Sequence, residues 1–177
     1  MKVWCVLILI ISCCSSCKET DRNRIARLVK HWEGKEILFP EDMVFTRYGI
    51  DTLNYKMKDS DFKLVAYIDS VGCISCKLNL QKWMGFVHEI DSLSSGTIEY
   101  LFIFHPNDKS ELKYLLKRDK FDIPVFMDNY DKFNKLNKLP DDDLFHVFLL
   151  DKHNRISVIG NPIYNIKLKE LYWKHIL

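Results

Sequence analysis

The sequence predicts an α/β fold in which a mixed central sheet carries helices on both faces. From residue 61 to about residue 139, apolar β-type runs alternate with stretches of helical periodicity. Two further β runs are then joined by a short polar turn, and a helical pattern closes the chain. The alternation favours parallel strands covered by helices, and the terminal hairpin adds antiparallel strands to the same sheet.

The first strand and helix of this domain flank a pair of cysteines. A strand is predicted at 63–69, where an apolar run ends in an acidic residue. A helix follows Cys73 and Cys76, because apolar residues recur on one face until Ser94-Ser95-Gly96 interrupts the pattern. These apolar residues are Leu80, Trp83 or Met84, Val87 and Ile90. Trp83 and Phe86 are expected in the core.

The rest of the domain continues the same alternation. A second strand is predicted at 97–104, and a helix opens at Asp108 and Glu111, whose spacing is that of a capping box. The remaining elements are a strand at 123–127, a short helix at 129–139, hairpin strands at 145–150 and 155–159, and a closing helix at 168–176.

The residues before 61 are predicted to have other roles, so that the sheet domain spans 61–177. Residues 1–16 have the basic start, short apolar run and small residues of a signal peptide. The apolar run is too short for a permanent membrane span. Residues 17–60 form an N-terminal extension, with a short amphipathic helix from Thr20 to Trp32 followed by irregular chain with short strands.

The end of the signal peptide resembles that of a bacterial lipoprotein, in which a cysteine becomes the lipidated first residue of the mature chain. Cys17 is the favoured acceptor, because the sequence becomes hydrophilic directly after it. Cys13 is the alternative, because Ile10-Ile11-Ser12-Cys13 fits the usual pattern best. The resemblance implies a lipid-anchored protein of the cell envelope, facing the periplasm or the outside. An ordinary secretory signal without lipid is the other interpretation.

The composition excludes two broad classes. The chain has 26 basic and 24 acidic residues, and its basic residues form no stripe interleaved with aromatics, so no nucleic-acid partner is expected. The hydrophobic content of 47%, with 6 glycines and 5 prolines, excludes a disordered or fibrous chain.

The pair Cys73 and Cys76 carries the predicted chemistry. At the opening of a helix, unpaired backbone N–H groups and the helix dipole stabilise a thiolate. Cys73 is therefore expected to attack a disulfide, and Cys76, about one turn along, to resolve the mixed disulfide. Lys77 either favours the thiolate or points into solvent. A permanent structural disulfide and half of a zinc site are the alternative interpretations of the same spacing.

Three segments resemble the thioredoxin-like superfamily. They are KLVAYIDSVGCISC at 63–76, FDIPVFMD at 121–128 and FLLD at 148–151. Within that superfamily they are most similar to membrane-anchored thiol-disulfide oxidoreductases and relatives of peroxiredoxins. The resemblance covers about 61–177. It implies that the dithiol opens the first helix of the core and exchanges disulfides with protein or small-thiol substrates, without a bound organic cofactor.

The chain departs from the usual motif of that superfamily at Gly72, where the superfamily has Trp, and at Ile74-Ser75, where it has Gly-Pro. The chain departs from the superfamily pattern at two further positions. The place of its cis-proline falls on Phe145, because Pro140 lies too early in the chain. The place of its buried carboxylate, six residues before the first cysteine, falls on Tyr67. His146 is adjacent to the cis-proline position and is a candidate neighbour of the dithiol that tunes its pKa or contacts a ligand. A packed or solvated histidine is the other interpretation.

Three functions follow as expectations. Thiol–disulfide exchange through Cys73 and Cys76 is the leading one. A non-catalytic binding or accessory lipoprotein with a structural disulfide is the second, and Phe145 in the cis-proline place favours it. A metal-handling relative that uses two thiolates and a histidine is the third.

Overall fold

The computed structural model describes residues 21–69, 78–94 and 98–177. The chain divides into two compact units, residues 1–31 and 32–177, and the sheet lies in the second. Helix α2 (Asp21–Trp32) confirms the predicted N-terminal helix. Among the helices within the described ranges, none combines the length and the apolarity needed to cross a bilayer.

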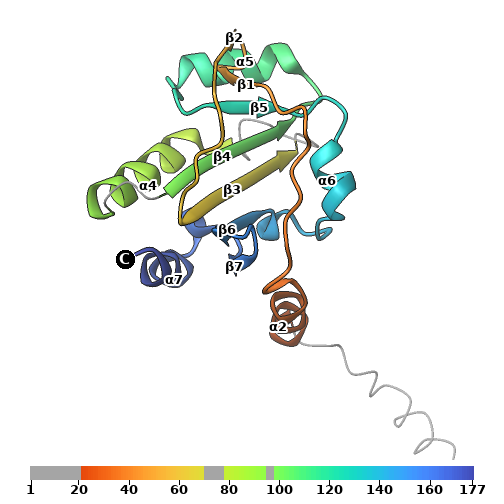
Figure 1. Ribbon diagram of the computed structural model, residues 1–177, viewed down its shortest axis with the longest axis vertical. Helices are drawn as coiled ribbons and strands as arrows, with labels where there is room; N and C mark the ends of the chain where they lie inside the picture. The colour runs from red at the N-terminus through yellow and green to blue at the C-terminus, as the bar shows by residue number, and fades with distance from the viewer. Residues whose placement is uncertain (1–20, 70–77, 95–97) are drawn as a thin grey trace, which may run out of the picture. The chain divides into compact units, whose positions relative to one another are not determined.

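The centre of the sheet is parallel, as the alternating pattern predicts. Within the described residues seven strands join in the order β2-β1-β5-β4-β3-β6-β7 (Figure 1). Strand β4 runs parallel to both of its neighbours, β3 and β5. The bounds of the three strands are β3 (Phe62–Asp69), β4 (Ile98–His105) and β5 (Val125–Met127).

Antiparallel strands complete the sheet on both sides. The predicted terminal hairpin is present as β6 (Val147–Asp151) and β7 (Ile156–Ile159), with β6 antiparallel to β3. On the other side, β1 (Phe45–Arg47) pairs with β5 and with β2 (Asp51–Thr52). The extension before residue 61 therefore contributes two short strands to the sheet. Phe45 stabilises this edge, because its ring is buried against Tyr55 and Phe126.

Helices cover both faces of the sheet, which confirms the predicted fold class. Side chains of α4 (Leu80–Leu93), α5 (Lys109–Arg118) and α7 (Ile166–Ile176) share one core cluster with Leu64 and Ala66 of β3. Tyr67 points to the opposite face, because successive side chains of a strand alternate. There it stacks on Phe133 of α6 (Lys132–Asn137), with 5.7 Å between the ring centroids.

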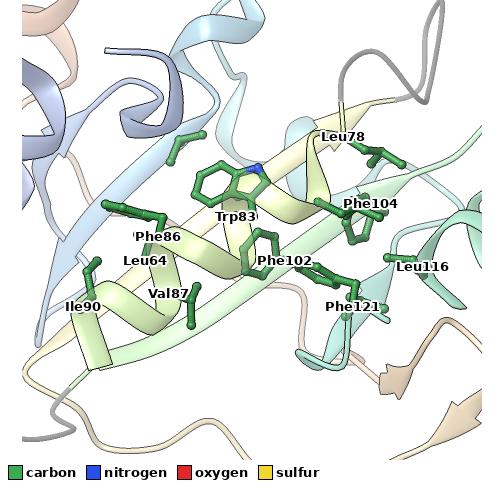
Figure 2. Packing of buried hydrophobic residues seen from close by; sticks show 14 of the residues in the cluster. Leu64, Leu78, Trp83, Phe86, Val87, Ile90, Phe102, Phe104, Leu116 and Phe121 are labelled. Atoms are coloured by element: carbon green, nitrogen blue, oxygen red, sulfur yellow. The ribbon is translucent and has the colours of Figure 1, made fainter. Parts of the chain in front are cut away.

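Aromatic side chains fill the core between the sheet and α4 (Figure 2). The ring of Phe102 packs edge-to-face against Trp83, at 5.2 Å between centroids, and against Phe121, at 5.0 Å. Trp83 and Phe86 are 1% and 3% exposed, which confirms that they belong to the core. Because edge-to-face aromatic pairs add to the burial of large apolar surfaces, this cluster fixes α4 on the sheet.

Candidate functional site

The dithiol segment is bounded by two well-packed elements. Cys73, Cys76 and Lys77 lie outside the described residues, as do the lipidation candidates Cys17 and Cys13. The described chain stops at Asp69, the last residue of β3, and resumes at Leu78. The structure therefore describes the residues on either side of 70–77, which are Asp69 and Leu78.

The start of α4 is held by contacts on several sides. Leu78 and Leu80 are each 2% exposed, and the backbone carbonyl of Asn79 accepts hydrogen bonds from the N–H groups of Lys82 and Trp83. Asn79 has a φ of 39°, in the left-handed region that asparagine tolerates. Its side-chain amide donates to the hydroxyl of Tyr164.

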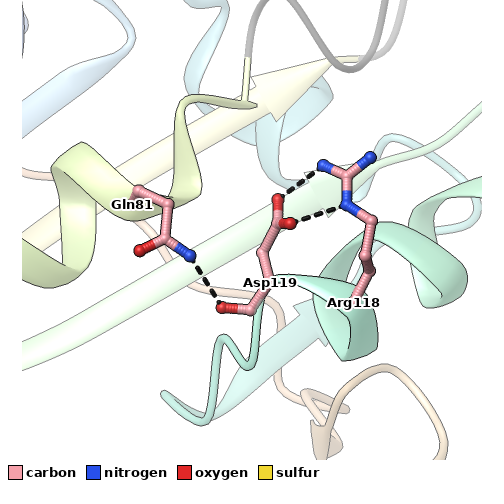
Figure 3. Close-up of polar contacts among 3 residues, drawn as sticks. All are labelled: Gln81, Arg118 and Asp119. Atoms are coloured by element: carbon pink, nitrogen blue, oxygen red, sulfur yellow. Dashed lines mark hydrogen bonds and ion pairs between the residues drawn. The ribbon is translucent and has the colours of Figure 1, made fainter.

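The first turn of α4 is also tied to the end of α5 (Figure 3). Gln81 donates from Nε2 to the carbonyl oxygen of Asp119, at 3.1 Å. The carboxylate of Asp119 accepts two hydrogen bonds from the Arg118 guanidinium, at 2.7 and 2.8 Å. The Arg118 guanidinium lowers the pKa of the Asp119 carboxyl. These contacts fix the N-terminal end of α4.

A pocket of about 250 Å³ lies between the end of β3 at Asp69 and the first turn of α4 at Trp83. Its wall includes Asp69, where the chain enters residues 70–77, and Tyr164, which binds Asn79 just after them. The described residues that line it are Tyr67, Ile68, Asp69, Trp83, Asp143, Leu144, His146, Val147, Asn161 and Tyr164. A larger pocket of about 400 Å³ lies around Gly49 and Met127, at the end of β5. We place the candidate site at the smaller one, because its lining includes Asp69, the residue before 70–77, and Tyr164, whose hydroxyl binds Asn79 after that segment.

The residue at the expected cis-proline position is buried in a short 3-10 helix. Phe145 ends η1 (Asp143–Phe145) and is 8% exposed. None of the peptide bonds between described residues is cis. The pocket is lined by the two neighbours of Phe145, Leu144 and His146, and Phe145 is not among its described lining residues. The acidic run 141–143 starts this helix, because Asp142 accepts a hydrogen bond from the backbone N–H of Leu144.

His146 is a buried wall of the pocket. Its side chain is 6% exposed, and its ring meets that of Tyr67 edge-on, with 5.4 Å between centroids. Nε2 lies 2.7 Å from the carbonyl oxygen of Pro140, and Nδ1 has no hydrogen-bond partner among the described residues. The backbone carbonyl of His146 accepts the N–H of Tyr67, at 3.0 Å, which continues the pairing of β6 with β3.

Tyr67 binds a carboxylate that belongs to a different element of the fold. Its hydroxyl donates to Oδ1 of Asp131, at 2.6 Å. Burial, and then the hydrogen bond to Asp131, raise the pKa of Tyr67 above its ordinary value, so the phenol stays neutral. Asp131 immediately precedes α6 and also accepts from the side-chain amide of Asn134. Sequence reasoning did not identify Asp131, and its only local signal is an acidic residue before a helix.

Another histidine, His105, is held at the end of β4. His105 Nδ1 lies 2.7 Å from the carbonyl oxygen of Asp128. Within the described ranges no group of three or more histidine, cysteine, aspartate or glutamate side chains is arranged to hold a metal ion. The predicted metal-handling alternative depends on Cys73 and Cys76, which lie outside those ranges.

Comparison with known proteins places this architecture among thioredoxin-like folds. No protein-family model and no curated protein matches the sequence. StoA from Bacillus subtilis is 15% identical with a TM-score of 0.51, over 73% of this chain and 94% of that chain. A thiol:disulfide interchange protein from a Bacteroides species is 11% identical with a TM-score of 0.55, over 80% and 90%. A mutant of PrxQ from Xylella fastidiosa is 10% identical with a TM-score of 0.53, over 81% and 96%.

These similarities show that the chain has the thioredoxin-like fold, as its sequence segments predict. The structures found include both thiol-disulfide oxidoreductases and a peroxiredoxin, the two groups named by the resemblance.

Proposed function

We propose that this protein is a thiol-disulfide oxidoreductase that reacts through Cys73 and Cys76. One observation carries the proposal: the CxxC pair follows β3 and precedes α4 in a chain with the thioredoxin-like fold. Because α4 has 14 residues and a fixed first turn, the positive end of its dipole favours a thiolate in the residues just before it.

The proposed reaction has two exchange steps. The Cys73 thiolate attacks one sulfur of a substrate disulfide, so that a mixed disulfide forms and the other substrate sulfur leaves as a thiolate that takes up a proton. Cys76 then attacks the Cys73 sulfur and releases the second substrate thiol. The substrate disulfide gains two electrons, and Cys73 and Cys76 are left as a disulfide. The opposite direction oxidises a substrate dithiol.

The pocket lined by Asp69 and Trp83 supports a substrate role. It joins an apolar wall, formed by Trp83 and Leu144, to polar groups at Asp143 and Asn161. Such a mixture can accommodate a short peptide or a small thiol. The solved thiol:disulfide interchange protein from Bacteroides, which shares the fold, is named for the same chemistry.

We also propose that the protein works in the bacterial cell envelope, held by a lipid on Cys17 or, alternatively, Cys13. The basis is the signal-like sequence of residues 1–16 and the polar stretch that follows Cys17. Mass spectrometry of the protein from a bacterial membrane fraction tests this location. A diacylglyceryl group on the first residue supports it, and an unmodified N-terminus at either cysteine contradicts it.

Single-turnover exchange with a disulfide-bonded peptide tests the reaction. The reduced chain is expected to convert the peptide to its dithiol, whereas Cys76→Ser stops at a mixed disulfide on Cys73. Cys73→Ser is expected to lose exchange, because Cys76 is the resolving thiol. Equal activity of Cys73→Ser and the unmodified chain would contradict the assignment.

A further inference from the structure

The pocket at the end of β5 contains both charged and apolar side chains. Its volume is about 400 Å³, and its described lining comes from residues 42–49, from α5, and from the chain between β5 and the start of α6. In open α/β sheets, ligands bind in crevices beyond the carboxyl ends of parallel strands, and β5 is such a strand. The charged residues that line the pocket are Asp42, Lys109, Lys113, Asp128 and Lys132.

Both carboxylates of this pocket are already engaged. Asp42 forms an ion pair with Lys132. Asp128 is 1% exposed, and its two oxygens accept the backbone N–H groups of Lys132, at 2.9 Å, and Phe133, at 2.8 Å. One of the three lysines is therefore paired, and the carboxylates of the pocket are bound to groups other than the remaining two.

These two lysines, Lys109 and Lys113, lie close together on α5. They are four residues apart, so they share one face of the helix, where like charges repel each other. Within the described part of the chain neither side chain forms an ion pair or a hydrogen bond. Two neighbouring ammonium groups at the wall of a pocket favour an oxyanion, which accepts charge-assisted hydrogen bonds from both.

The stem of Lys113 is held in place beside Gly49. Gly49 is buried and has a φ of 69°, and a Cβ added there would lie 3.2 Å from Cγ of Lys113 and 3.4 Å from Sδ of Met127. The missing side chain lets the lysine stem and the thioether approach this turn closely. Because the stem is already confined, Lys113 loses less conformational freedom when its ammonium binds a ligand.

An apolar surface continues from the two lysines. It consists of Val44, Phe126 and Met127. Val44 is 54% exposed, so a ligand that covered it would remove apolar area from water. The side-chain amide of Asn129 also lines the pocket, has no hydrogen-bond partner among the described residues, and is a further donor. An apolar wall with a few convergent polar groups is typical of small-molecule sites.

We propose that this pocket binds a small organic anion. Its phosphate or carboxylate group contacts Lys109 and Lys113, and its apolar body lies on Val44 and Met127. A volume of about 400 Å³ is in the range of small-molecule sites, which favours such a ligand over a macromolecule. The proposal does not depend on the dithiol chemistry, because none of these residues belongs to the proposed exchange reaction.

NMR spectroscopy of the isotope-labelled full-length chain tests the site, with the backbone amides of Gly49, Lys113 and Asn129 as reporters. The probes are phenyl phosphate and phenylacetate, which carry the two oxyanions on the same ring, and benzyl alcohol is the neutral control. We expect at least one anion to shift these amides saturably, with a Kd below about 5 mM. Benzyl alcohol should bind at least about fivefold more weakly. The tighter of the two anions identifies the preferred group.

Substitution of the two lysines tests their role. In the double variant Lys109→Gln, Lys113→Gln, the Kd of the tighter anion should rise at least about tenfold, because two charge-assisted hydrogen bonds are lost. Lys117→Gln changes an exposed lysine of the same helix that is absent from the described lining, and its Kd should stay within about twofold. The proposal is overturned by the absence of saturable shifts with both anions or by equal binding of benzyl alcohol. It is also overturned if the double variant binds as tightly as the unsubstituted chain or no more weakly than Lys117→Gln.

Discussion

The hydroxyl of Tyr67 donates a hydrogen bond to Asp131, 64 residues further along the chain, at 2.6 Å. This contact ties the C-terminal end of β3, which precedes the dithiol segment in the sequence, to the beginning of α6 on the same face of the sheet. Because one partner is a carboxylate, the bond is stronger than a neutral one. It also explains how a partly buried carboxylate reaches this end of the sheet when β3 itself presents a tyrosine.

Removing the Tyr67 hydroxyl is expected to destabilise the protein. Tyr67→Phe should lower the free energy of unfolding by about 1.5–3 kcal/mol, because a hydrogen bond to a charged group is lost and Asp131 keeps its desolvation cost. Urea unfolding at pH 7 measures the change. In a double-mutant cycle, the same substitution made in Asp131→Ala should cost much less. A loss below about 0.5 kcal/mol in the unmodified background would contradict the contact.

Alkaline pH should destabilise the fold through three tyrosines whose hydroxyls bind carboxylates. Burial, and then the carboxylate that each phenol binds, raise the pKa of Tyr55, Tyr67 and Tyr100 above the ordinary value. The native state then holds these protons more tightly than the unfolded chain. Their stabilisation is complete below pH 10 and is lost as the pH rises above it, because only the unfolded phenols ionise.

The contribution of Tyr67 to this loss can be isolated. Each such tyrosine adds about 1.4 kcal/mol per pH unit to the fall in stability above pH 10. Urea unfolding between pH 10 and 11.5 should therefore give a slope that is smaller by this amount in Tyr67→Phe. An equal slope in the two proteins would mean that Tyr67 ionises as easily in the native state as in the unfolded one.

The aromatic cluster under α4 should dominate the stability of the core. Phe102 has no exposed surface and packs edge-to-face on Trp83 and Phe121. Phe102→Ala is expected to cost about 3–5 kcal/mol, because it removes this packing and leaves a cavity. Tyr114→Ala, on the exposed side of α5, is the matched control and should stay within about 0.5 kcal/mol. Similar losses at both positions would contradict the packing in Figure 2.

Two glycines are expected to respond in opposite ways to alanine. Gly85 lies inside α4, and an added methyl group there meets nothing within 4 Å, so Gly85→Ala should stabilise the protein by about 0.5–1 kcal/mol. Gly160 has a φ of 120°, and its added Cβ would lie 2.9 Å from Leu168. Gly160→Ala should therefore destabilise it by about 1–3 kcal/mol. Thermal unfolding of the two variants side by side tests both signs.

The fold was predictable because its signals are local. The periodicity from Leu80 to Ile90 defines the buried face of α4, and the apolar runs define β3, β4 and the terminal hairpin. Strands β1 and β2 are three and two residues long, and β1 is placed in the sheet by its pairing with β5, some 80 residues away. A pattern of so few residues does not specify a partner at that distance.

The site was only partly predictable, for a similar reason. The sequence identifies the dithiol by its spacing and selects His146 by its place beside the cis-proline position. It does not identify Asp131 as the partner of Tyr67, because β3 and α6 meet only in the folded chain. Nor does it indicate the tautomer of His146, which depends on the carbonyl of Pro140 at the turn before η1. Both contacts follow from tertiary packing.

The redox potential of the Cys73–Cys76 pair tests the central claim most directly. The full-length chain is equilibrated with glutathione buffers, alkylated, and followed by the mass of the peptide that contains both cysteines. A potential between about −120 and −270 mV, the range of known exchange proteins, is the result expected for a working oxidoreductase. A pair that stays oxidised below about −300 mV, or that is reduced only when the chain unfolds, would identify a structural disulfide and contradict the proposed function.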